Sequence, residues 1–336
     1  MAFDQHGRTV DYLRISVTDR CNLRCLYCMP EEGVPPKPHD AMLTLEELIS
    51  FVKVAAGEGF KRIRLTGGEP LVRLGIEDLV AGIQAIEGIE SVAMTTNGIL
   101  LTKMAEKLRQ AGLTRVNISL DTLDPEQYRT ITRWGNLDEV LQGVDTALST
   151  GFEPVKINVV VVRSLQQDVL AFARMSLERP LHVRFIEYMP VGDACGSEGL
   201  GWTKEDTIPN EELIALINMQ LEESGLGSLQ PVSQQSETPD GWGPARYYRL
   251  DGAQGTVGFI SALSRHFCSE CNRLRLTVDG ELLPCLFSDN SYDVKSALRS
   301  KDDEAVRKVI QRALQCKPDE HHYRVGTQHY MSQIGG

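Results

Sequence analysis

Eight cysteines are the residues of this 336-residue chain whose type and spacing could most clearly do chemistry. Six of them form two triplets, namely Cys21, Cys25 and Cys28 near the start and Cys268, Cys271 and Cys285 near the end. Cys195 and Cys316 stand alone. A chain of this size can stabilise itself through a hydrophobic core without disulfides. In a reducing compartment disulfides would not persist, so clustered thiols there indicate metal binding or catalysis.

The first triplet places three thiols within one short segment, with the spacing Cys-x3-Cys-x2-Cys. Three thiolates can hold one face of a [4Fe–4S] cluster and leave one iron without a protein ligand, whereas an ordinary electron-transfer cluster has four cysteine ligands. The alternative is zinc, but structural zinc normally has a fourth protein ligand, and the nearest histidine downstream is His39. The spacing therefore favours a cluster with an open iron, where another molecule binds.

The second triplet again offers three thiols, and a predicted β-hairpin over Arg273–Leu283 with an Asp-Gly turn lies between its last two cysteines. The hairpin returns the chain, so Cys285 can face the other two. Strand alternation places Arg273 and Arg275 on one face, and two guanidiniums beside a cluster suit an anion or a purine. The alternative is a zinc site with His266 as the fourth ligand.

The elements that must position these cysteines alternate between strand and helix over the first two-thirds of the chain. We expect strands over Tyr12–Thr18, Lys61–Thr66, Ser91–Thr96, Thr114–Leu120, Val155–Val162 and His182–Tyr188. We expect helices after a capping box at Thr44–Glu47 and over Ile76–Ile86, Thr102–Gln110, Leu137–Leu148 and Asp168–Leu177. Repeated βα units imply a parallel sheet with right-handed crossovers. Periodicity does not decide whether that sheet is open and doubly wound or curved into an incomplete barrel.

The βα rhythm ends after Pro190. The glycine-rich segment Gly192–Asp206 is expected to be a loop, and the Gly-, Ser-, Gln- and Pro-rich stretch 225–244 a mobile insertion or linker. Further helices are expected over Asn210–Glu222, Val294–Leu298 and Asp303–Leu314, with short strands over Arg246–Leu250 and Thr256–Ser261.

Composition excludes several classes of protein. Of the residues, 42% are hydrophobic and 24% are charged, which is typical of globular chains. Apolar runs such as Val159–Val162 are too short to span a bilayer, and Met1–Val10 lacks the apolar region of a secretory signal. The net charge of −11 opposes binding to nucleic acid or an anionic membrane. We therefore expect a cytoplasmic protein with neither of these partners.

The segment CNLRCLYC at 21–28 resembles the signature of the radical S-adenosylmethionine superfamily, and Gly67-Gly68-Glu69-Pro70 resembles the motif that lines the S-adenosylmethionine amino group. The resemblance implies an α/β fold, an incomplete (βα)6 barrel whose chemistry gathers at the carboxyl ends of the strands. It also implies a [4Fe–4S] cluster that donates an electron to S-adenosylmethionine chelated at the open iron. The resulting 5′-deoxyadenosyl radical abstracts a hydrogen from the substrate.

Longer segments resemble one branch of this superfamily, the GTP 3′,8-cyclases of molybdenum cofactor biosynthesis. They are Gly7–Pro30, Arg64–Leu71, Arg115–Leu123 and Phe267–Leu286, with shorter matches at TTNG, VKINVVV and RFIEYMP. No motif position departs from the family pattern, and 192–244 aligns with nothing. The resemblance implies a lyase that cyclises GTP to (8S)-3′,8-cyclo-7,8-dihydroguanosine 5′-triphosphate. In that reaction the adenosyl radical takes the ribose 3′ hydrogen, and the carbon radical closes on C8 of guanine.

The resemblance also implies two domains and a role for each motif residue. Residues 1–190 would form the barrel, and 191–336 a domain that closes it, carries a second [4Fe–4S] cluster with an open iron for the purine, and ends in a Gly-Gly tail. The clusters would be held by Cys21, Cys25 and Cys28, and by Cys268, Cys271 and Cys285. S-Adenosylmethionine would contact Tyr27, Gly68, Ser119 and Met189. GTP would contact Arg14, Arg64, Thr95, Lys156, Arg273 and Arg275, with Arg273, Arg275, Gly335 and Gly336 also needed for catalysis.

The chain contains no Walker-type phosphate-binding loop, so a nucleotide must be held by side chains on strands. The family implies an electron donor, a homodimer, and transfer of the product to cyclic pyranopterin monophosphate synthase. The alternatives are another twin-cluster radical enzyme, such as a peptide-modifying maturase, and an iron–sulfur or zinc electron carrier without catalysis. Several motifs directed at one cavity argue against a carrier. Cys195, Cys316, His321 and His322 are expected to be structural or surface residues, with zinc at Cys316 and His321 as the alternative.

Overall fold

The computed structural model describes residues 2–189, 202–232, 238–239, 241–288, 290–321 and 331–334. The predictions made for Pro190, Cys195, His322, Gly335 and Gly336 lie outside the described residues, as do most of Gly192–Asp206 and part of 225–244. In the part of the chain that is described, twelve strands form one continuous sheet. No helix there is long and apolar enough to cross a lipid bilayer.

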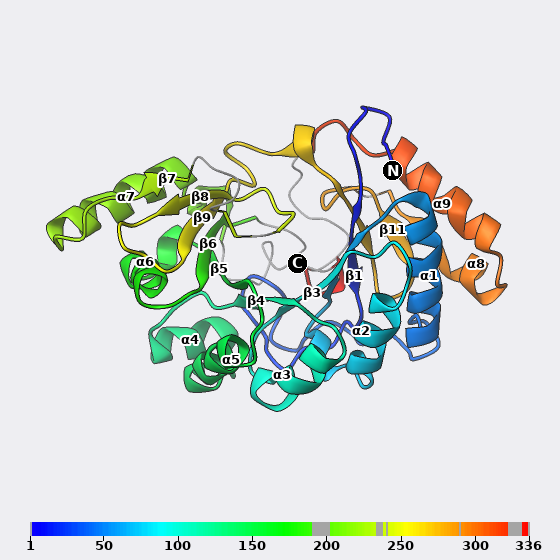
Figure 1. The fold of residues 1–336 in the computed structure, drawn as a ribbon, viewed down its shortest axis with the longest axis horizontal. Coiled ribbons are helices and arrows are strands. Elements are labelled where there is room, and N and C mark those ends of the chain that lie inside the picture. Colours follow the sequence, from blue (N-terminus) through cyan, green and yellow to red (C-terminus); the bar gives the residue numbers. More distant parts are fainter. Residues whose placement is uncertain are drawn as a thin grey trace.

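Six consecutive parallel strands form the middle of the sheet, and each pairs with the next along the chain. They are β1 (Tyr12–Ser16), β2 (Arg62–Thr66), β3 (Ser91–Thr96), β4 (Arg115–Ser119), β5 (Val155–Val161) and β6 (His182–Glu187). The helices between them lie on the outside of the curved sheet (Figure 1), and are α1 (Leu45–Glu58), α2 (Ile76–Gln84), α3 (Leu101–Gln110), α4 (Pro125–Thr132), α5 (Leu137–Ser149) and α6 (Val169–Glu178). The predicted βα architecture is confirmed.

Helix α4 is the one α-helix of this region that the sequence analysis did not predict. Its signals are nevertheless present, because the Asp124 side chain accepts the N–H of Gln127 and Pro125 lies in the first turn. An aspartate cap followed by proline is typical of a helix start. The helix has only eight residues, which leaves little room for an apolar period to show.

Strands from the last third of the chain extend both edges of the six-stranded sheet. On one edge β10 (Arg273–Leu276) pairs parallel with β1, followed by β11 (Glu281–Leu283) and β12 (Tyr292–Asp293). On the other edge β9 (Thr256–Ile260) pairs parallel with β6, followed by β8 (Arg246–Arg249) and β7 (Gln230–Pro231). The predicted hairpin is confirmed as β10–β11, but its pairing with β1 was not predicted.

The sheet has one apolar and one polar face. Residues such as Leu13, Ile63, Val116 and Ile157 point to the helices and are buried in the main hydrophobic core. The alternate residues of the same strands are polar, because side chains of a strand point to opposite faces in turn. On this inner face the register places Arg275, Arg14 and Arg64 side by side on β10, β1 and β2.

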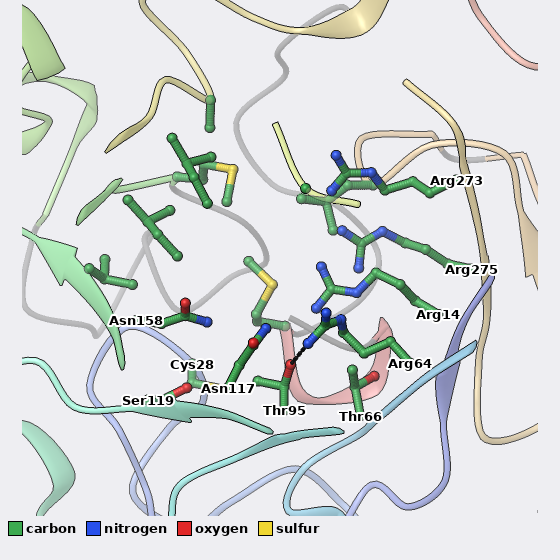
Figure 2. A pocket seen from close by; sticks show the side chains of 18 of the residues that line it. Arg14, Cys28, Arg64, Thr66, Thr95, Asn117, Ser119, Asn158, Arg273 and Arg275 are labelled. Carbon is green, nitrogen blue, oxygen red and sulfur yellow. Dashed lines mark hydrogen bonds between the residues drawn. The ribbon is translucent and has the colours of Figure 1, made fainter. Parts of the chain in front are cut away.

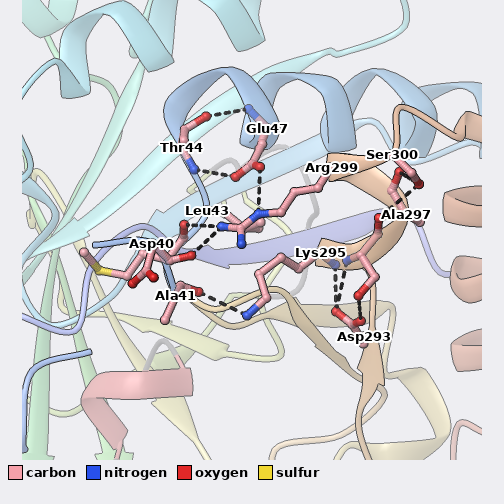
Figure 3. Close-up of polar contacts among 12 residues, drawn as sticks. Asp40, Ala41, Leu43, Thr44, Glu47, Asp293, Lys295, Ala297, Arg299 and Ser300 are labelled. Carbon is pink, nitrogen blue, oxygen red and sulfur yellow. Dashed lines mark hydrogen bonds and ion pairs between the residues drawn. The ribbon is translucent and has the colours of Figure 1, made fainter. Parts of the chain in front are cut away.

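Helices α7 (Asn210–Glu223), α8 (Lys295–Arg299) and α9 (Asp303–Gln315) flank the barrel, and the short α10 (Met331–Ile334) ends the described chain. The α8 contact with the segment before α1 is shown in Figure 3. Arg299 donates to the carbonyl oxygen of Asp40 (2.6 Å) and pairs with Glu47 (3.2 Å). Glu47 also completes the capping box of α1 with Thr44, which confirms that prediction. Residues 40–47 therefore tie the C-terminal helices to the barrel.

Candidate active site

The polar face of the sheet lines a cavity of about 310 Å³. Both cysteine triplets line this cavity, so two groups more than 200 residues apart in the sequence meet in one chamber. The other lining residues include the predicted Arg14, Tyr27, Arg64, Gly68, Thr95, Ser119, Met189, Arg273 and Arg275. In Figure 2 four arginines from β1, β2 and β10 stand in a row and point into it.

The first triplet lies in the loop that follows β1. The N–H of Cys28 donates to the carbonyl oxygen of Cys25 (2.9 Å), and the N–H of Leu23 donates to Sγ of Cys21 (3.4 Å). None of the three forms a disulfide. Burial raises the pKa of Cys21 to about 11 and, together with the charge of Cys21, that of Cys28 to about 12. A metal centre would stabilise three such thiolates at neutral pH, because metal binding displaces the thiol protons.

Gly68 brings the loop after β2 directly against the cysteine loop. Its N–H donates to the carbonyl oxygen of Thr18 (2.7 Å), and the N–H of Glu69 donates to that of Arg20 (2.8 Å). A Cβ on Gly68 would lie 2.2 Å from the Arg20 oxygen. Only glycine permits this approach of two backbones.

Glu69 is buried behind this loop and connects it to the loop after β3. Its carboxylate accepts hydrogen bonds from the Thr96 hydroxyl (2.7 Å) and from the backbone N–H groups of Asn97 (2.7 Å) and Leu71 (3.0 Å). Burial outweighs these bonds and raises the pKa of Glu69 to about 7. Asn97 in turn donates to the Asn22 side chain (2.7 Å), which lies next to Cys21.

Tyr27, between the second and third cysteines of the triplet, is held by Asp121. Its hydroxyl donates to one carboxylate oxygen of Asp121 (2.6 Å), and the N–H of Val160 donates to the other (2.8 Å). Burial raises the pKa of Asp121 to about 6, although both hydrogen bonds oppose that shift. The loop after β4 therefore fixes the ring of a residue predicted to contact S-adenosylmethionine.

The second triplet lies at the open end of the β10–β11 hairpin, before the first strand and after the second. Cys268 begins a short 3-10 helix that ends at Glu270, Cys271 follows it directly, and Cys285 follows β11. Lys317 donates to Sγ of Cys271 (3.3 Å). Burial raises the pKa of Cys271, but the charges of Lys317 and Arg273 outweigh it and lower that pKa to about 7.

Two histidines lie beside Cys268. Nδ1 of His321 is 3.1 Å from Sγ of Cys268, and the rings of His321 and His266 are 5.2 Å apart. Of the residues described, His266, Cys268 and His321 are close enough together to share a metal ion. Cys316 is exposed and is not part of this group, so the pairing of His321 with Cys316 considered from the sequence is corrected to a pairing with Cys268.

The arginine row carries a high local positive charge. Burial, followed by the charge of Arg275, lowers the pKa of Arg14, and burial with the charge of Arg273 lowers that of Arg275 to about 10. Arg64 donates to the hydroxyls of Tyr12 and of Thr95, the latter at 3.4 Å (Figure 2). Guanidiniums crowded in this way repel one another, and a bound polyanion would relieve that repulsion.

Lys156 is the predicted substrate residue that the structure does not place in the cavity wall. It is buried, and its Nζ lies over the ring of Tyr247 at 5.8 Å from the centroid. Arg184 lines the cavity instead, with Nε 3.0 Å from the Asn158 side-chain oxygen. Arg184 lies two residues further along the strands than Lys156, since the register partner of Lys156 is His182 and that of Asn158 is Arg184.

Helix α10 brings the C-terminal end of the chain into the chamber. Met331 and Ser332 line the cavity, and the backbone N–H of Ser332 forms a hydrogen bond with Cys28. Arg275 donates to the carbonyl oxygen of Ile334 (3.2 Å). The last described turn therefore bridges the first cysteine set and the arginine row.

Comparison with known proteins agrees with this geometry. The chain matches the family model of the radical SAM superfamily over residues 15–175 and that of Molybdenum Cofactor Synthesis C over 181–323. GTP 3′,8-cyclases of Pelotomaculum thermopropionicum and Moorella thermoacetica are each 49% identical to it over 337 residues, covering 99% of both chains. The chain belongs to the GTP 3′,8-cyclase family.

Among solved structures, Streptococcus suis SuiB bound to S-adenosylmethionine has a TM-score of 0.59 over 91% of this chain and 69% of its own, at 16% identity. Identity at that level shows the shared fold alone. The expected radical SAM fold is therefore confirmed, and the cyclase relatives outweigh the alternative of a peptide-modifying maturase.

As a member of this radical SAM family, the chain uses a [4Fe–4S] cluster and S-adenosylmethionine. The first cysteine set fits such a cluster, because three half-buried thiols without disulfide partners line one cavity. The second set offers the same kind of donors and is therefore consistent with another cluster.

The sequence reasoning assigned no role to four residues that the structure places at the site, namely Glu69, Asp121, Arg184 and Lys317. His321, expected to be a structural or surface residue, lines the cavity. Asp121 and Glu69 stand in motifs that were recognised at strand ends. Arg184 could have been found from strand alternation on β6. Lys317 stands outside every motif, so no signal in the sequence indicated it.

Proposed function

We propose that this protein cyclises GTP to (8S)-3′,8-cyclo-7,8-dihydroguanosine 5′-triphosphate, an early lyase step of molybdenum cofactor biosynthesis. One observation carries the proposal: two sets of three thiols and a row of four arginines line the same cavity. A purine nucleoside triphosphate has the charge that the arginines need, and the relatives at 49% identity are GTP 3′,8-cyclases.

The six cysteines hold two [4Fe–4S] clusters in this proposal. Cys21, Cys25 and Cys28 hold the first, and Cys268, Cys271 and Cys285 hold the second. When bound, the first cluster with S-adenosylmethionine supplies a radical that abstracts the ribose 3′ hydrogen, and the second supplies an open iron to the purine. Tyr27, Gly68, Ser119 and Met189 contact S-adenosylmethionine.

The side chains on the strands bind and orient the nucleotide. Arg14, Arg64, Arg273 and Arg275 neutralise its triphosphate, and Thr95 orients Arg64 through the hydrogen bond described above. Lys156 serves from beside the chamber, where its charge adds to the positive potential. Arg273, Arg275 and the Gly335-Gly336 tail are also required for the cyclisation.

The remaining features of the proposal concern the chain as a whole. Residues 1–190 act as the radical SAM barrel and 191–336 as the domain that carries the second cluster. We also propose a cytoplasmic location, a homodimer, an electron donor, and transfer of the product to cyclic pyranopterin monophosphate synthase. A reductant is required because S-adenosylmethionine cleavage consumes one electron.

The test uses protein purified and reconstituted without oxygen. Two clusters require roughly eight iron atoms per chain, and we expect 5′-deoxyadenosine to form when GTP is added. Cys285→Ala should abolish cyclisation while the first cluster and S-adenosylmethionine cleavage remain detectable. Zinc in place of iron at the second set, unchanged cyclisation in Cys285→Ala, or deoxyadenosine formed only with a peptide would contradict the proposal.

A further inference from the structure

Lys317 is a fully buried lysine next to the second cysteine set. It follows α9, and the residue is only 2% exposed. Its Nζ lies 2.8 Å from the carbonyl oxygens of Arg273 and Pro284 and 3.3 Å from Sγ of Cys271. An ammonium group has three N–H donors, so here each donor has one acceptor. Burying an ammonium is costly unless it is hydrogen-bonded and paired with a negative charge.

One of the three acceptors is the sulfur of Cys271, and the other two are backbone carbonyl groups close to cysteines in the sequence. Arg273 begins β10, two residues after Cys271, and Pro284 immediately precedes Cys285. Lys317 therefore connects the start of one strand to the end of the next and holds two cysteines at a fixed separation. The two carbonyl groups are neutral, so the sulfur is the one acceptor of the three that can carry a negative charge.

The first residues of the chain hold Lys317 in this place. Gln5 donates to the carbonyl oxygen of Lys317 (3.1 Å), and Arg8 donates to that of Pro318 (2.6 Å). The same Arg8 guanidinium donates to the carbonyl oxygen of Cys268 (2.6 Å). The N-terminal segment thus ties Cys268, the first cysteine of the set, to the segment that carries Lys317.

We propose that Lys317 is a positioning residue of the second cysteine set, which fixes Cys271 relative to Cys285 and raises the reduction potential of the cluster bound there. The inference rests on the second cluster of the proposed function. Hydrogen bonds to the cluster sulfurs and local charge are among the factors that set iron–sulfur potentials. A buried positive charge stabilises the reduced cluster, which is the more negative of the two states, so removing the charge lowers the potential.

The experiment compares Lys317→Met with Lys61→Met in the full chain, reconstituted without oxygen. Methionine has nearly the length of lysine but no N–H donor and no charge. Lys61 is a matched control because its Nζ pairs with the exposed Glu90 (2.7 Å) at the surface. Both variants are made in a background in which Cys21, Cys25 and Cys28 are alanine, so that the spectroscopic signal comes from the second cluster alone.

The readout is the midpoint potential of the second cluster, measured by a redox titration followed by electron paramagnetic resonance. At the parent midpoint we expect the ratio of reduced to oxidised cluster to be about tenfold lower in Lys317→Met, a shift of about 59 mV for one electron. Lys61→Met should titrate with the parent. Iron content is measured separately in chains that keep Cys21, Cys25 and Cys28. There the iron content of Lys317→Met should fall by up to half, because iron is lost from the second set.

An unchanged potential at full iron content in Lys317→Met would overturn the inference and leave the proposed function intact. A parent chain that binds only about four iron atoms would overturn the second cluster, and the inference with it. If Lys317→Met does not fold, Lys317→Gln decides, since it keeps an N–H donor but carries no charge. A lower potential or selective loss of the second cluster in that variant supports the inference, and a parent-like potential overturns it.

Discussion

At the scale of single residues, the chamber is built from charged and ionisable groups whose ordinary behaviour is altered by burial. The carboxyl groups of Glu69 and Asp121 have raised pKa values of about 7 and 6, and the pKa of Arg275 is lowered to about 10. In each case burial is the largest cause. Ionisable groups whose pKa values are shifted by burial are typical of functional sites.

Glu69 gives a prediction on pH and stability. Its pKa is about 7 in the folded chain and 4.5 ordinarily, so between these values the unfolded state loses a proton that the folded state keeps. Stability contributed by Glu69 is therefore fully present below pH 4.5 and is lost as the pH rises to about 7. Relative to Glu69→Gln, we expect the free energy of unfolding to fall by roughly 3 kcal/mol over this range.

Urea unfolding of the cluster-free, reduced protein at a series of pH values measures this difference. Subtracting the Glu69→Gln curve removes the contributions of all other titrating groups. Two curves that stay parallel from pH 4.5 to 7 would show that Glu69 is ionised in the folded chain.

Arg14 gives a prediction on substrate affinity. It stands in the middle of the arginine row, with Arg275 and Arg64 as its register partners. Hydrogen bonds to charged groups contribute about 1.5–3 kcal/mol, so Arg14→Met should raise the KM for GTP by roughly 10- to 100-fold. Arg62→Met on β2 is the control, since Arg62 pairs with Asp11 and does not line the cavity. An equal rise in KM for both variants would contradict a direct role for Arg14.

At the scale of secondary-structure elements, sequence reasoning worked where a local pattern determines the structure. The strand β3 was predicted with its observed bounds, and α1 begins after the capping box at Thr44. The pairing of β10 with β1 could not be predicted in this way, because a four-residue strand finds its partner through packing of distant segments. Lys317 was missed for the same reason, since its acceptors come together only in the fold.

The close approach of Gly68, in the loop after β2, to the first cysteine loop leads to a prediction on S-adenosylmethionine cleavage. In Gly68→Ala the new Cβ would meet the Arg20 carbonyl oxygen at 2.2 Å, so the loop must move away from the first cysteine set. We expect at least a tenfold loss of S-adenosylmethionine cleavage, with the iron of the second set retained. Gly57→Ala is the control, because a Cβ there meets nothing within 4 Å and alanine in a helix stabilises by roughly 0.5–1 kcal/mol. Normal cleavage by Gly68→Ala would show that the close approach is not required.

At the scale of the whole molecule, both ends of the chain converge on the chamber. The N-terminal segment holds Cys268 through Arg8, and α10 touches Cys28 and Arg275 from the C-terminal side. Two distant parts of the sequence thus complete a site whose central strands are contiguous. Helix α10 thus connects the two cysteine sets. It contacts Cys28 of the first set and Arg275 on β10, the strand that begins two residues after Cys271 of the second set.

Removal of residues 331–336 tests that coupling. The deletion removes one acceptor of Arg275, the carbonyl oxygen of Ile334, and uncovers Leu283, which packs against Ile334, but it removes no cysteine. We therefore expect iron content and S-adenosylmethionine cleavage to remain within about twofold, while the yield of cyclised GTP per deoxyadenosine falls at least tenfold, since a misplaced substrate loses reaction rate steeply. The ratio of the two products, measured by chromatography under anaerobic turnover, separates this result from a general loss of activity.

Ile334→Asp keeps the chain length and should lower the ratio of cyclised GTP to deoxyadenosine as well, because an aspartate cannot pack on Leu283. A deletion variant with an unchanged ratio would mean that the two ends of the chamber work independently of α10.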